Sequence, residues 1–314
     1  MTSLILFIFL FFAALCIGSF LNVVILRAFT GESIVLPPSK CPKCHERIKW
    51  YDNIPVLSYL ILRGKCRFCK ENISVQYPVV EIITAILFML IFYKFHFSIT
   101  SLFLIIIASL SIVISTTDIK EKVVFDAHTI SFIVVAVLYN LVQGNIVNSL
   151  IGMISAAIIM EGLARLGYLV VKKRAFGEGD TYIAAGIGAM AGIKTFIIIL
   201  ALSILAQAII ILPFFIKKMW ENKEEKFAII LTLFLITTAT YKSLDYKLEL
   251  NTLITTIFII SIIILGIYSC VKLLKISKVQ EELTHLPFGP SLLITNILLI
   301  FFGKEIIVFL SKVF

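Results

Sequence analysis

Long uninterrupted apolar runs dominate this 314-residue chain and decide its fold class. Hydrophobic residues make up 60% of the sequence and charged residues only 15%, whereas a soluble domain carries about a quarter charged residues. A run of about 20 apolar residues crosses a bilayer as a helix. The sequence therefore predicts an all-α polytopic membrane protein with about 8–10 transmembrane helices. We expect spans at 2–26, 79–97, 100–117, 129–143, 146–170, 181–193, 196–216, 227–241, 252–271 and 290–311.

The distribution of basic residues predicts the orientation of these spans. Cytoplasmic loops carry an excess of Lys and Arg. If the loop at 30–78 is cytoplasmic, alternation places 22 of the 28 Lys and Arg residues on that side. We expect a multi-pass protein of the cell membrane with its N-terminus outside and membrane lipid around it. Topology explains the net charge of +9, so no nucleic-acid partner is expected.

The start of the chain reads as a permanent first span, because no Lys or Arg precedes Arg27 and a signal peptide would begin with a basic region. Two later spans, 129–143 and 181–193, are short for a bilayer, which predicts that one or both are tilted, re-entrant or in a thinned bilayer. The expected organisation is a first transmembrane helix at 1–29, a cytoplasmic tetracysteine loop at 30–78, a catalytic transmembrane core at 79–216, an inserted pair of spans at 217–282 and a last transmembrane helix at 283–314.

Four of the six cysteines form two C-x-x-C pairs within the predicted loop. Cys41 and Cys44 make the first pair, and Cys66 and Cys69 follow after 21 intervening residues. Each pair directs two thiolates to one point, and four thiolates are the ligand set of a tetrahedral zinc site. Such a zinc ion would be structural, since no coordination position stays open. The alternative is two disulfides, which need an oxidising compartment, so a cytoplasmic loop favours zinc.

Two aspartates at span ends are the strongest candidates for chemistry, because acidic residues beside apolar spans are costly. Asp118 ends the span at 100–117, and Asp180 begins the span at 181–193. Two spans separate them, so both carboxylates should reach the cytoplasmic face. Two close carboxylates share a proton, which lets one activate water while the other protonates a carbonyl. The simpler alternatives are a helix N-cap for Asp180 and a polar span end for Asp118.

Small residues surround the second aspartate. Gly177 and Gly179 precede it and let the backbone turn tightly and approach a substrate strand. Ala184, Gly188 and Gly192 recur at every fourth position of the following span, a pattern that predicts close contact with another helix.

Three other acids have open roles. Asp126 is better placed to cap the next span than to act in catalysis. Glu178 either perturbs its neighbouring aspartate or faces solvent. Glu81 is either a first-turn acid favoured by the helix dipole or a polar group that reaches a cytoplasmic cleft, which makes it a weak candidate for cofactor binding. Zinc-protease, serine-hydrolase and phosphate-loop signatures are missing from the sequence.

Taken in order, these motifs resemble the bacterial type IV prepilin peptidases, which are membrane aspartic proteases with a G-x-G-D signature. The resemblance covers about 1–216 and 283–314. It rests on both cysteine pairs, on Asp118, and on the segments 18–27, 53–59, 62–66, 73–74, 77–81, 177–180 and 286–290.

The resemblance implies an activity. Members of the family cleave the leader of type IV prepilins and type II secretion pseudopilins at the cytoplasmic membrane face, after Gly and usually before Phe. Many then N-methylate the new N-terminus with S-adenosylmethionine. The catalytic pair of the family corresponds to Asp118 and Asp180, and its tetracysteine loop corresponds to the four paired cysteines. The family usually has eight spans, so the segment at 217–282 is a surplus of unknown role.

Two other classes of function stay open from the residues alone. A transporter would carry its acids near span centres or between half-helices, whereas these lie at span ends. A relative with only methyltransferase or binding function would keep the cysteines and lose an aspartate, whereas both aspartates are present. The sequence sets neither the cognate pilin nor an oligomeric state.

Overall fold

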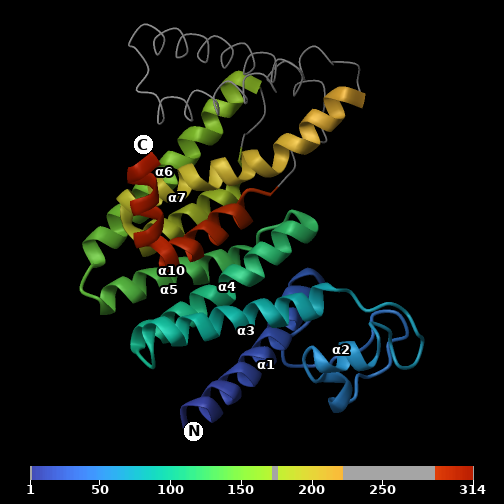
Figure 1. Ribbon diagram of the computed structural model, residues 1–314. Coiled ribbons are helices and arrows are strands. Elements are labelled where there is room, and N and C mark those ends of the chain that lie inside the picture. Colours follow the sequence, from blue (N-terminus) through green and yellow to red (C-terminus); the bar gives the residue numbers. More distant parts are fainter. Residues whose placement is uncertain (1, 172–175, 222–286, 314) are drawn as a thin grey trace, which may run out of the picture. The chain divides into compact units, whose positions relative to one another are not determined.

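The structure, a computed structural model, describes residues 2–171, 176–221 and 287–313 (Figure 1). These residues are helical apart from their loops and confirm the all-α prediction. Within these described ranges, six helices are long and apolar enough to cross a membrane, judged by length and composition, and α5 is a shorter apolar helix. The elements are α1 (Thr2–Thr30), the 3₁₀ helix η1 (Trp50–Asn53), α2 (Leu57–Ile61), α3 (Gln76–Phe95), α4 (Ile99–Glu121), α5 (Asp126–Val142), α6 (Ile146–Val171), α7 (Glu178–Glu221) and α10 (Gly289–Val313).

The chain forms two compact units, and every site discussed below lies in the larger one. The smaller unit contains the ends of α6 and α7. Nearly all of the predicted insertion at 217–282, with its two expected spans at 227–241 and 252–271, lies outside the described residues. The larger unit comprises 1–161, 177–202 and 287–314, and the smaller unit comprises 162–176 and 203–286.

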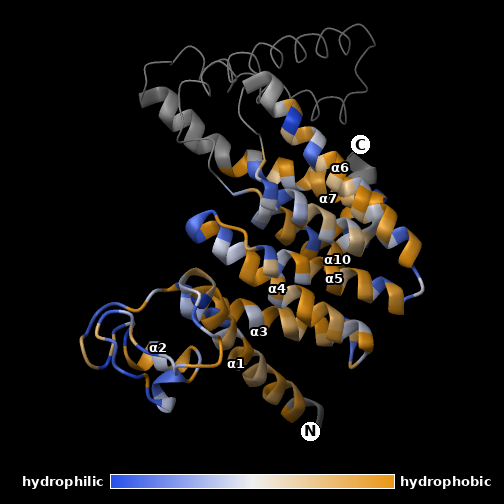
Figure 2. Cartoon of the chain, turned by 180° about the vertical axis from the view of Figure 1, so that it is seen from behind, coloured by the Kyte–Doolittle hydropathy of each residue, from blue (hydrophilic) through white to orange (hydrophobic). Residues whose placement is uncertain are grey.

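Within the larger unit, α4 packs against α1, α3, α5 and α10. Apolar side chains from four helices meet in one cluster, which includes Leu15 of α1, Phe88 of α3, Leu104 of α4 and Phe301 of α10. The outer faces of the helices stay apolar, and Figure 2 shows polar residues concentrated in the loop between α1 and α3. This distribution is typical of helices that bury one face in protein and expose the other to lipid.

The stripe of small residues in α7 makes the close helix contact that the sequence predicts. A Cβ at Gly188 would lie 2.3 Å from the carbonyl oxygen of Gly152 in α6. No side chain fits at that distance, so glycine allows the two backbones to touch. Ala184, one turn earlier, is fully buried. The contact fixes the helix whose first turn carries Asp180.

Helix α7 covers both spans predicted at 181–193 and 196–216, with a break at one residue. Gly192 has φ 74° and ψ 166°, which is a non-helical conformation open mainly to glycine. The sequence predicts two spans joined by a connection at 194–195. That connection is wrong, because the interruption is a single glycine, Gly192, inside one helical run.

Buried polar side chains donate hydrogen bonds to the carbonyls just before this break. The Asn140 amide of α5 donates to the carbonyl of Ala189 at 2.8 Å and to that of Met190 at 3.0 Å. The Ser149 hydroxyl of α6 also donates to Ala189 at 2.7 Å. The break is therefore a specified feature of the fold.

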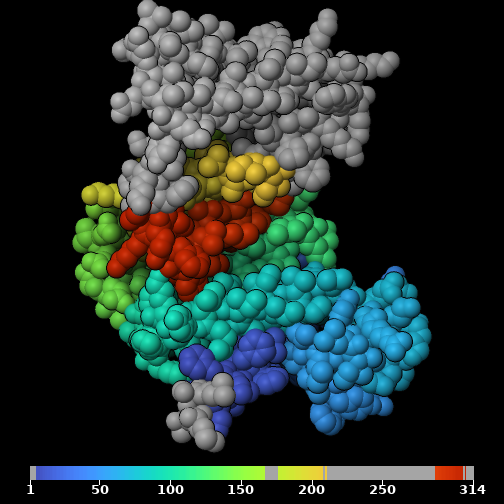
Figure 3. Space-filling view, viewed as in Figure 1, coloured from blue at the N-terminus to red at the C-terminus, as the bar shows by residue number. Residues whose placement is uncertain are grey.

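The loop between α1 and α3 forms a lobe beside these two helices (Figure 3). It contains η1 and α2 and has almost no apolar interior. Cys41 is the only apolar residue classed as buried within 31–75. The lobe must therefore be held by something other than a hydrophobic core.

Candidate active site and metal centre

Asp118 lies in the last turn of α4. The helix ends three residues later at Glu121, and Lys122 adopts a left-handed conformation with its N–H bonded to the Asp118 carbonyl at 2.9 Å. The Asp118 side chain is only 6% exposed. Its Oδ2 atom is buried and has no hydrogen-bond partner within the described part of the chain.

Asp180 lies in the first turn of α7, which begins at Glu178. Its Oδ2 accepts the backbone N–H of Gly177 at 3.0 Å, and its side chain is 8% exposed. Asp180 therefore follows the helix start by two positions, and the N-cap alternative does not describe it. Gly179 packs so closely on Val124 that a Cβ would lie 2.6 Å from the valine Cβ.

The two carboxylates meet at the first residue of α10. A Cβ on Gly289 would lie 2.7 Å from Asp118 Oδ2 and 3.4 Å from Asp180 Oδ1. Three segments far apart in the sequence thus converge on one point. The structure brings the two predicted aspartates together, as the spacing of two spans between them implies.

This arrangement can hold a proton between two acids. Two buried carboxylates that face one position repel each other when both are ionised, and sharing one proton relieves the repulsion. Such a pair offers a base and an acid at the same time. The unpartnered Oδ2 of Asp118 is an acceptor that faces Gly289, where a side chain would block it.

Asp126 does not cap α5. The N-cap position belongs to Phe125, without a side-chain cap, and Asp126 is the first helical residue. The predicted capping role is therefore wrong, although an acid in the first turn still complements the helix dipole.

The two cysteine pairs fold as matching turns. Each first cysteine donates its N–H to a carbonyl five residues later, Glu46 at 2.9 Å and Glu71 at 2.8 Å. The residue after each second cysteine, His45 or Lys70, has a positive φ. An isolated β-bridge flanks each turn, from 40 to 47 and from 65 to 72.

These turns place all four sulfur atoms in one cluster. The Sγ atoms of Cys41, Cys44, Cys66 and Cys69 lie within 4.8 Å of one another, and all four are free thiols. The Sγ atoms of Cys41 and Cys69 are 3.9 Å apart, far beyond a disulfide bond. Tetrahedral coordination with bonds of about 2.3 Å needs sulfurs at about this spacing, so the thiols fit a single metal ion.

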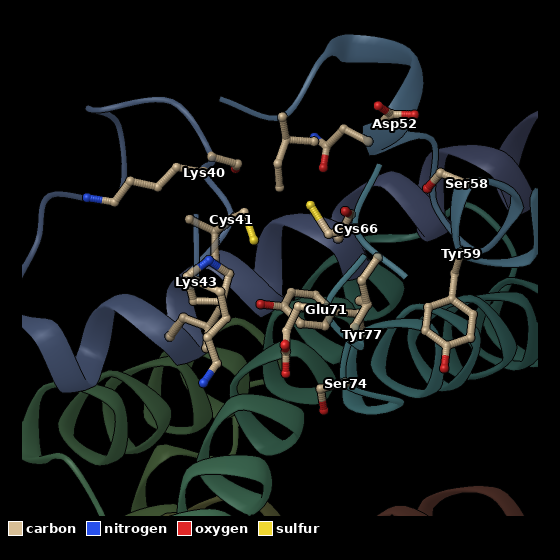
Figure 4. Close-up of a pocket in the computed structure, with 18 of the residues that line it drawn as sticks. Lys40, Cys41, Lys43, Asp52, Ser58, Tyr59, Cys66, Glu71, Ser74 and Tyr77 are labelled. Atoms are coloured by element: carbon tan, nitrogen blue, oxygen red, sulfur yellow. The ribbon is translucent and has the colours of Figure 1, made fainter. Parts of the chain in front are cut away.

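A cavity of about 700 Å³ lies between the lobe and helices α1 and α3, with Lys120 of α4 at its edge. Figure 4 shows the sulfur atoms of Cys41 and Cys66 near one another beside this cavity, with Tyr59 and Tyr77 also in its wall. Neither catalytic candidate lines it. The cavity and the aspartate pair are therefore separate features of the larger unit.

Glu81 reaches the same cavity from the first part of α3. Its side chain is 5% exposed, and its Oε2 accepts the backbone N–H of Val56 at 2.7 Å. Val56 has φ 60°, a strained conformation for a β-branched residue. Of the two roles that the sequence left open, the structure therefore favours a group that reaches the cavity and the lobe.

The role of Gly289 was missed by sequence reasoning. The segment 286–290 was noted only because it resembles the start of a last span. A linear motif does not say which carboxylates its backbone approaches, since that depends on how α10 packs against α4.

The fold and these sites define a helical membrane protein with a buried aspartate pair at helix ends and a four-thiol cluster in a loop. Two family descriptions match consecutive parts of the chain. Residues 12–95 match the bacterial peptidase A24 N-terminal domain, and residues 105–212 match the type IV leader peptidase family. The chain belongs to the peptidase A24 family of prepilin leader peptidases.

Several relatives share the sequence beyond a single motif. A prepilin leader peptidase/N-methyltransferase of Klebsiella pneumoniae is 32% identical over 192 residues, covering 59% of this chain and 84% of that protein. The type 4 prepilin-like proteins leader peptide-processing enzyme of Escherichia coli O78:H11 is 33% identical, covering 57% and 74%. A prepilin leader peptidase/N-methyltransferase of Myxococcus xanthus is 35% identical over 58% of this chain, and the match spans 55% of its length. No solved structure matches the chain significantly.

Proposed function

We propose that the protein is an aspartic endopeptidase that removes the leader of type IV prepilins or pseudopilins. Cleavage would follow a Gly, usually before a Phe, at the cytoplasmic face of the cell membrane. The observation that carries this proposal is the meeting of Asp118 and Asp180 at Gly289 in a chain of the peptidase A24 family. Both aspartates lie at helix ends, which suits a scissile bond presented at the membrane surface.

The proposed reaction uses the shared proton of the pair. One aspartate takes a proton from water, and the resulting oxygen attacks the scissile carbonyl carbon while the other aspartate protonates the carbonyl oxygen. Collapse of the tetrahedral intermediate breaks the C–N bond, and the leaving amine receives the proton that the first aspartate took. One hydroxyl of the intermediate returns its proton to the second aspartate as the new carboxyl group forms, which restores the pair. The two carboxylates titrate together, so the roles of base and acid belong to the pair.

We also propose that the new N-terminus is methylated with S-adenosylmethionine, an activity that the names of the relatives include. The cavity supports this proposal, because its volume falls within the usual range of about 300–1,000 Å³ for small-molecule sites. Glu81, Tyr59 and Tyr77 give it a carboxylate and two aromatic faces, which suit a sulfonium cation. When bound, the donor supplies an electrophilic methyl group for the amine.

The four-thiol cluster is proposed to hold one structural zinc ion. Four thiolates are a preferred zinc ligand set, and a closed set leaves no position for catalysis. Cys41, Cys44, Cys66 and Cys69 would be the ligands. In the cytoplasmic position proposed for the lobe, thiols stay reduced, which favours metal over disulfides.

A single assay tests both activities. Purified protein in detergent is incubated with S-adenosylmethionine and a synthetic prepilin whose basic leader ends at Gly–Phe, and mass spectrometry reads leader loss and methyl gain. We expect wild type to show both, and Asp118→Asn and Asp180→Asn each to lose cleavage. Asp126→Asn is the matched control and should cleave normally.

The outcomes separate the two proposals. Full cleavage by Asp118→Asn would overturn the peptidase assignment. Glu81→Gln should keep cleavage and lose methyl transfer if Glu81 serves the donor site. Loss of both activities in Glu81→Gln would instead mean that its bond to Val56 holds the whole lobe in place.

A further inference from the structure

The segment directly after α1 folds back along that helix. Gly31 has φ 67° and donates its N–H to the Arg27 carbonyl at 2.9 Å, which ends the helix and reverses the chain. The Arg27 guanidinium then donates to the carbonyls of Ser33 and Pro37. These bonds hold the segment against the last turns of α1.

The tip of this segment is apolar and exposed. Ile34, Val35 and Leu36 are 48%, 76% and 68% exposed, although they lie outside every candidate membrane span. Three consecutive exposed apolar residues would be unfavourable in water, and contiguous apolar patches mark contact surfaces.

The tip also lies level with the apolar part of α1. Ile34 and Val35 line a cavity of about 310 Å³ together with Cys16 and Phe20 of that helix. Phe20 is ten residues before the end of α1, which corresponds to about 15 Å along the axis. No charged residue occurs in α1 before Arg27, so the tip stands beside helix that composition places inside the bilayer.

Part of the backbone of the segment is bonded, which lowers the cost of placing it in an apolar surrounding. Polar main-chain groups are costly in lipid unless they are bonded. The carbonyls of Ser33 and Pro37 accept hydrogen bonds from the Arg27 guanidinium, and the Val35 N–H donates to the Ser33 hydroxyl at 3.3 Å. Pro37 and its neighbour Pro38 have no N–H to satisfy.

We propose that Ile34–Val35–Leu36 inserts into the membrane and anchors the tetracysteine lobe to the bilayer. The occupant is lipid, because the tip continues the surface on which Ile17 and Phe20 of α1 are themselves 39% and 48% exposed. Arg27 sits at the boundary, where its long side chain keeps the charge at the polar level while its stem lies along apolar surface. The lobe is thereby held at the membrane surface at a point separate from its metal cluster.

Tryptophan fluorescence in vesicles tests this anchor. Val35→Trp is made in full-length protein that carries Trp50→Phe and Trp220→Phe, and emission is measured with bromine-labelled lipids and with iodide in the water. Because Val35 is mostly exposed, the larger side chain displaces no packing. We expect lipid quenching as strong as that of Phe20→Trp in the same background, and weak quenching by iodide. Lys43→Trp, exposed between the first two cysteines, should behave in the opposite way.

Strong iodide quenching of Val35→Trp without lipid quenching would overturn the proposal. Shielding that arises only after a prepilin peptide is added would assign the tip to substrate, and shielding that grows with protein density would assign it to a second copy. Either result would also overturn the lipid anchor. Leu36→Trp repeats the measurement at a second exposed position, so the test does not depend on one variant.

Discussion

The lobe at 31–75 and the helical core are stabilised by different means. In the core, apolar side chains of α1, α3, α4 and α10 pack into shared clusters. In the lobe, Cys41 is the only buried apolar residue, and large apolar residues such as Trp50 and Leu60 are 79% and 63% exposed. Burial contributes roughly 25 cal/mol per Å² of apolar surface, so it stabilises the core strongly and the lobe very little.

This difference indicates which kind of substitution should disrupt each region. The lobe depends on a few discrete bonds, namely the thiol cluster, the Asp52–Arg67 pair and the bond from Val56 to Glu81. The aspartate pair depends on how closely three helices approach. Damage to the lobe should therefore act through ligand loss, and damage to the site through backbone displacement.

The largest effect is expected from removing a thiol ligand. If the thiol cluster holds the proposed zinc ion, Cys66→Ser should release it and unfold the lobe, because structural zinc contributes on the order of 10 kcal/mol or more in small zinc domains. Elemental analysis would report the metal, and limited proteolysis would report cleavage within 31–75. The helical core should keep its thermal unfolding temperature in detergent.

Cys16→Ser is the matched control, since Cys16 is an exposed cysteine of α1 outside the cluster. It should leave metal content and proteolysis unchanged. A lobe that stays protease-resistant in Cys66→Ser would show that the comparison between the two regions is mistaken.

The second-largest effect is expected from crowding the site where Asp118 and Asp180 meet. Gly289→Ala puts a methyl group 2.7 Å from Asp118 Oδ2 and also 2.7 Å from Ile183 Cδ1, so α10 or the carboxylates must move. Misplacement of about 1 Å can cost about 100-fold in rate, and we expect a loss of that order in prepilin cleavage. Metal content should not change.

Gly303→Ala lies in the same helix and gives a clean reference. Among the described residues, a Cβ there would meet nothing closer than 3.8 Å, so activity should be preserved. Equal cleavage by Gly289→Ala and Gly303→Ala would contradict the crowded geometry of the site.

The third prediction concerns the stability of the helix break in α7. Asn140→Leu removes the amide that donates to the carbonyls of Ala189 and Met190. The Ala189 carbonyl keeps the Ser149 hydroxyl, so the main loss is at Met190, where a buried acceptor left unpaired costs about 1–3 kcal/mol. Thermal unfolding in detergent should shift to lower temperature. Ser131→Ala, on the same helix, removes an exposed hydroxyl bonded only to its own helix and should have little effect.

The helices could largely be predicted from the sequence, because apolar runs between charged ends set their lengths. The expected spans at 2–26 and 79–97 correspond to α1 and α3, and 290–311 corresponds to α10. The cysteine cluster was equally accessible, since spacing alone brings four thiols together.

What could not be predicted depends on contacts between distant segments. The helix break at Gly192 is bonded by Asn140 of another helix, and the position of Gly289 against both carboxylates depends on the packing of α10 on α4. The spacing of apolar residues along one segment carries no information about such contacts. The pairing of Asp118 with Asp180 was accessible because span alternation places both on one face and because the family resemblance implies the same pair.

The smallest effect is expected from an ion pair in the lobe. Arg67 Nε and Nη2 donate to both carboxylate oxygens of Asp52, with Nε–Oδ2 at 2.8 Å and Nη2–Oδ1 at 2.6 Å. The pair links η1 to the second cysteine turn. Direct hydrogen bonding from Arg67 holds the pKa of Asp52 below its ordinary value.

The pKa of Asp52 is lower in the folded protein than in the unfolded chain, where it is about 3.9. The ion pair therefore stabilises the fold in full at pH values above the unfolded pKa, and this stabilisation is lost as the pH falls through the folded pKa. Asp52→Asn should therefore make the lobe slightly more protease-sensitive, by the same amount at every pH between about 5 and 8. The effect should also shrink at high salt, since Arg67 is exposed and surface pairs are screened. A difference that varied across this pH range would mean that a group other than Asp52 controls the lobe.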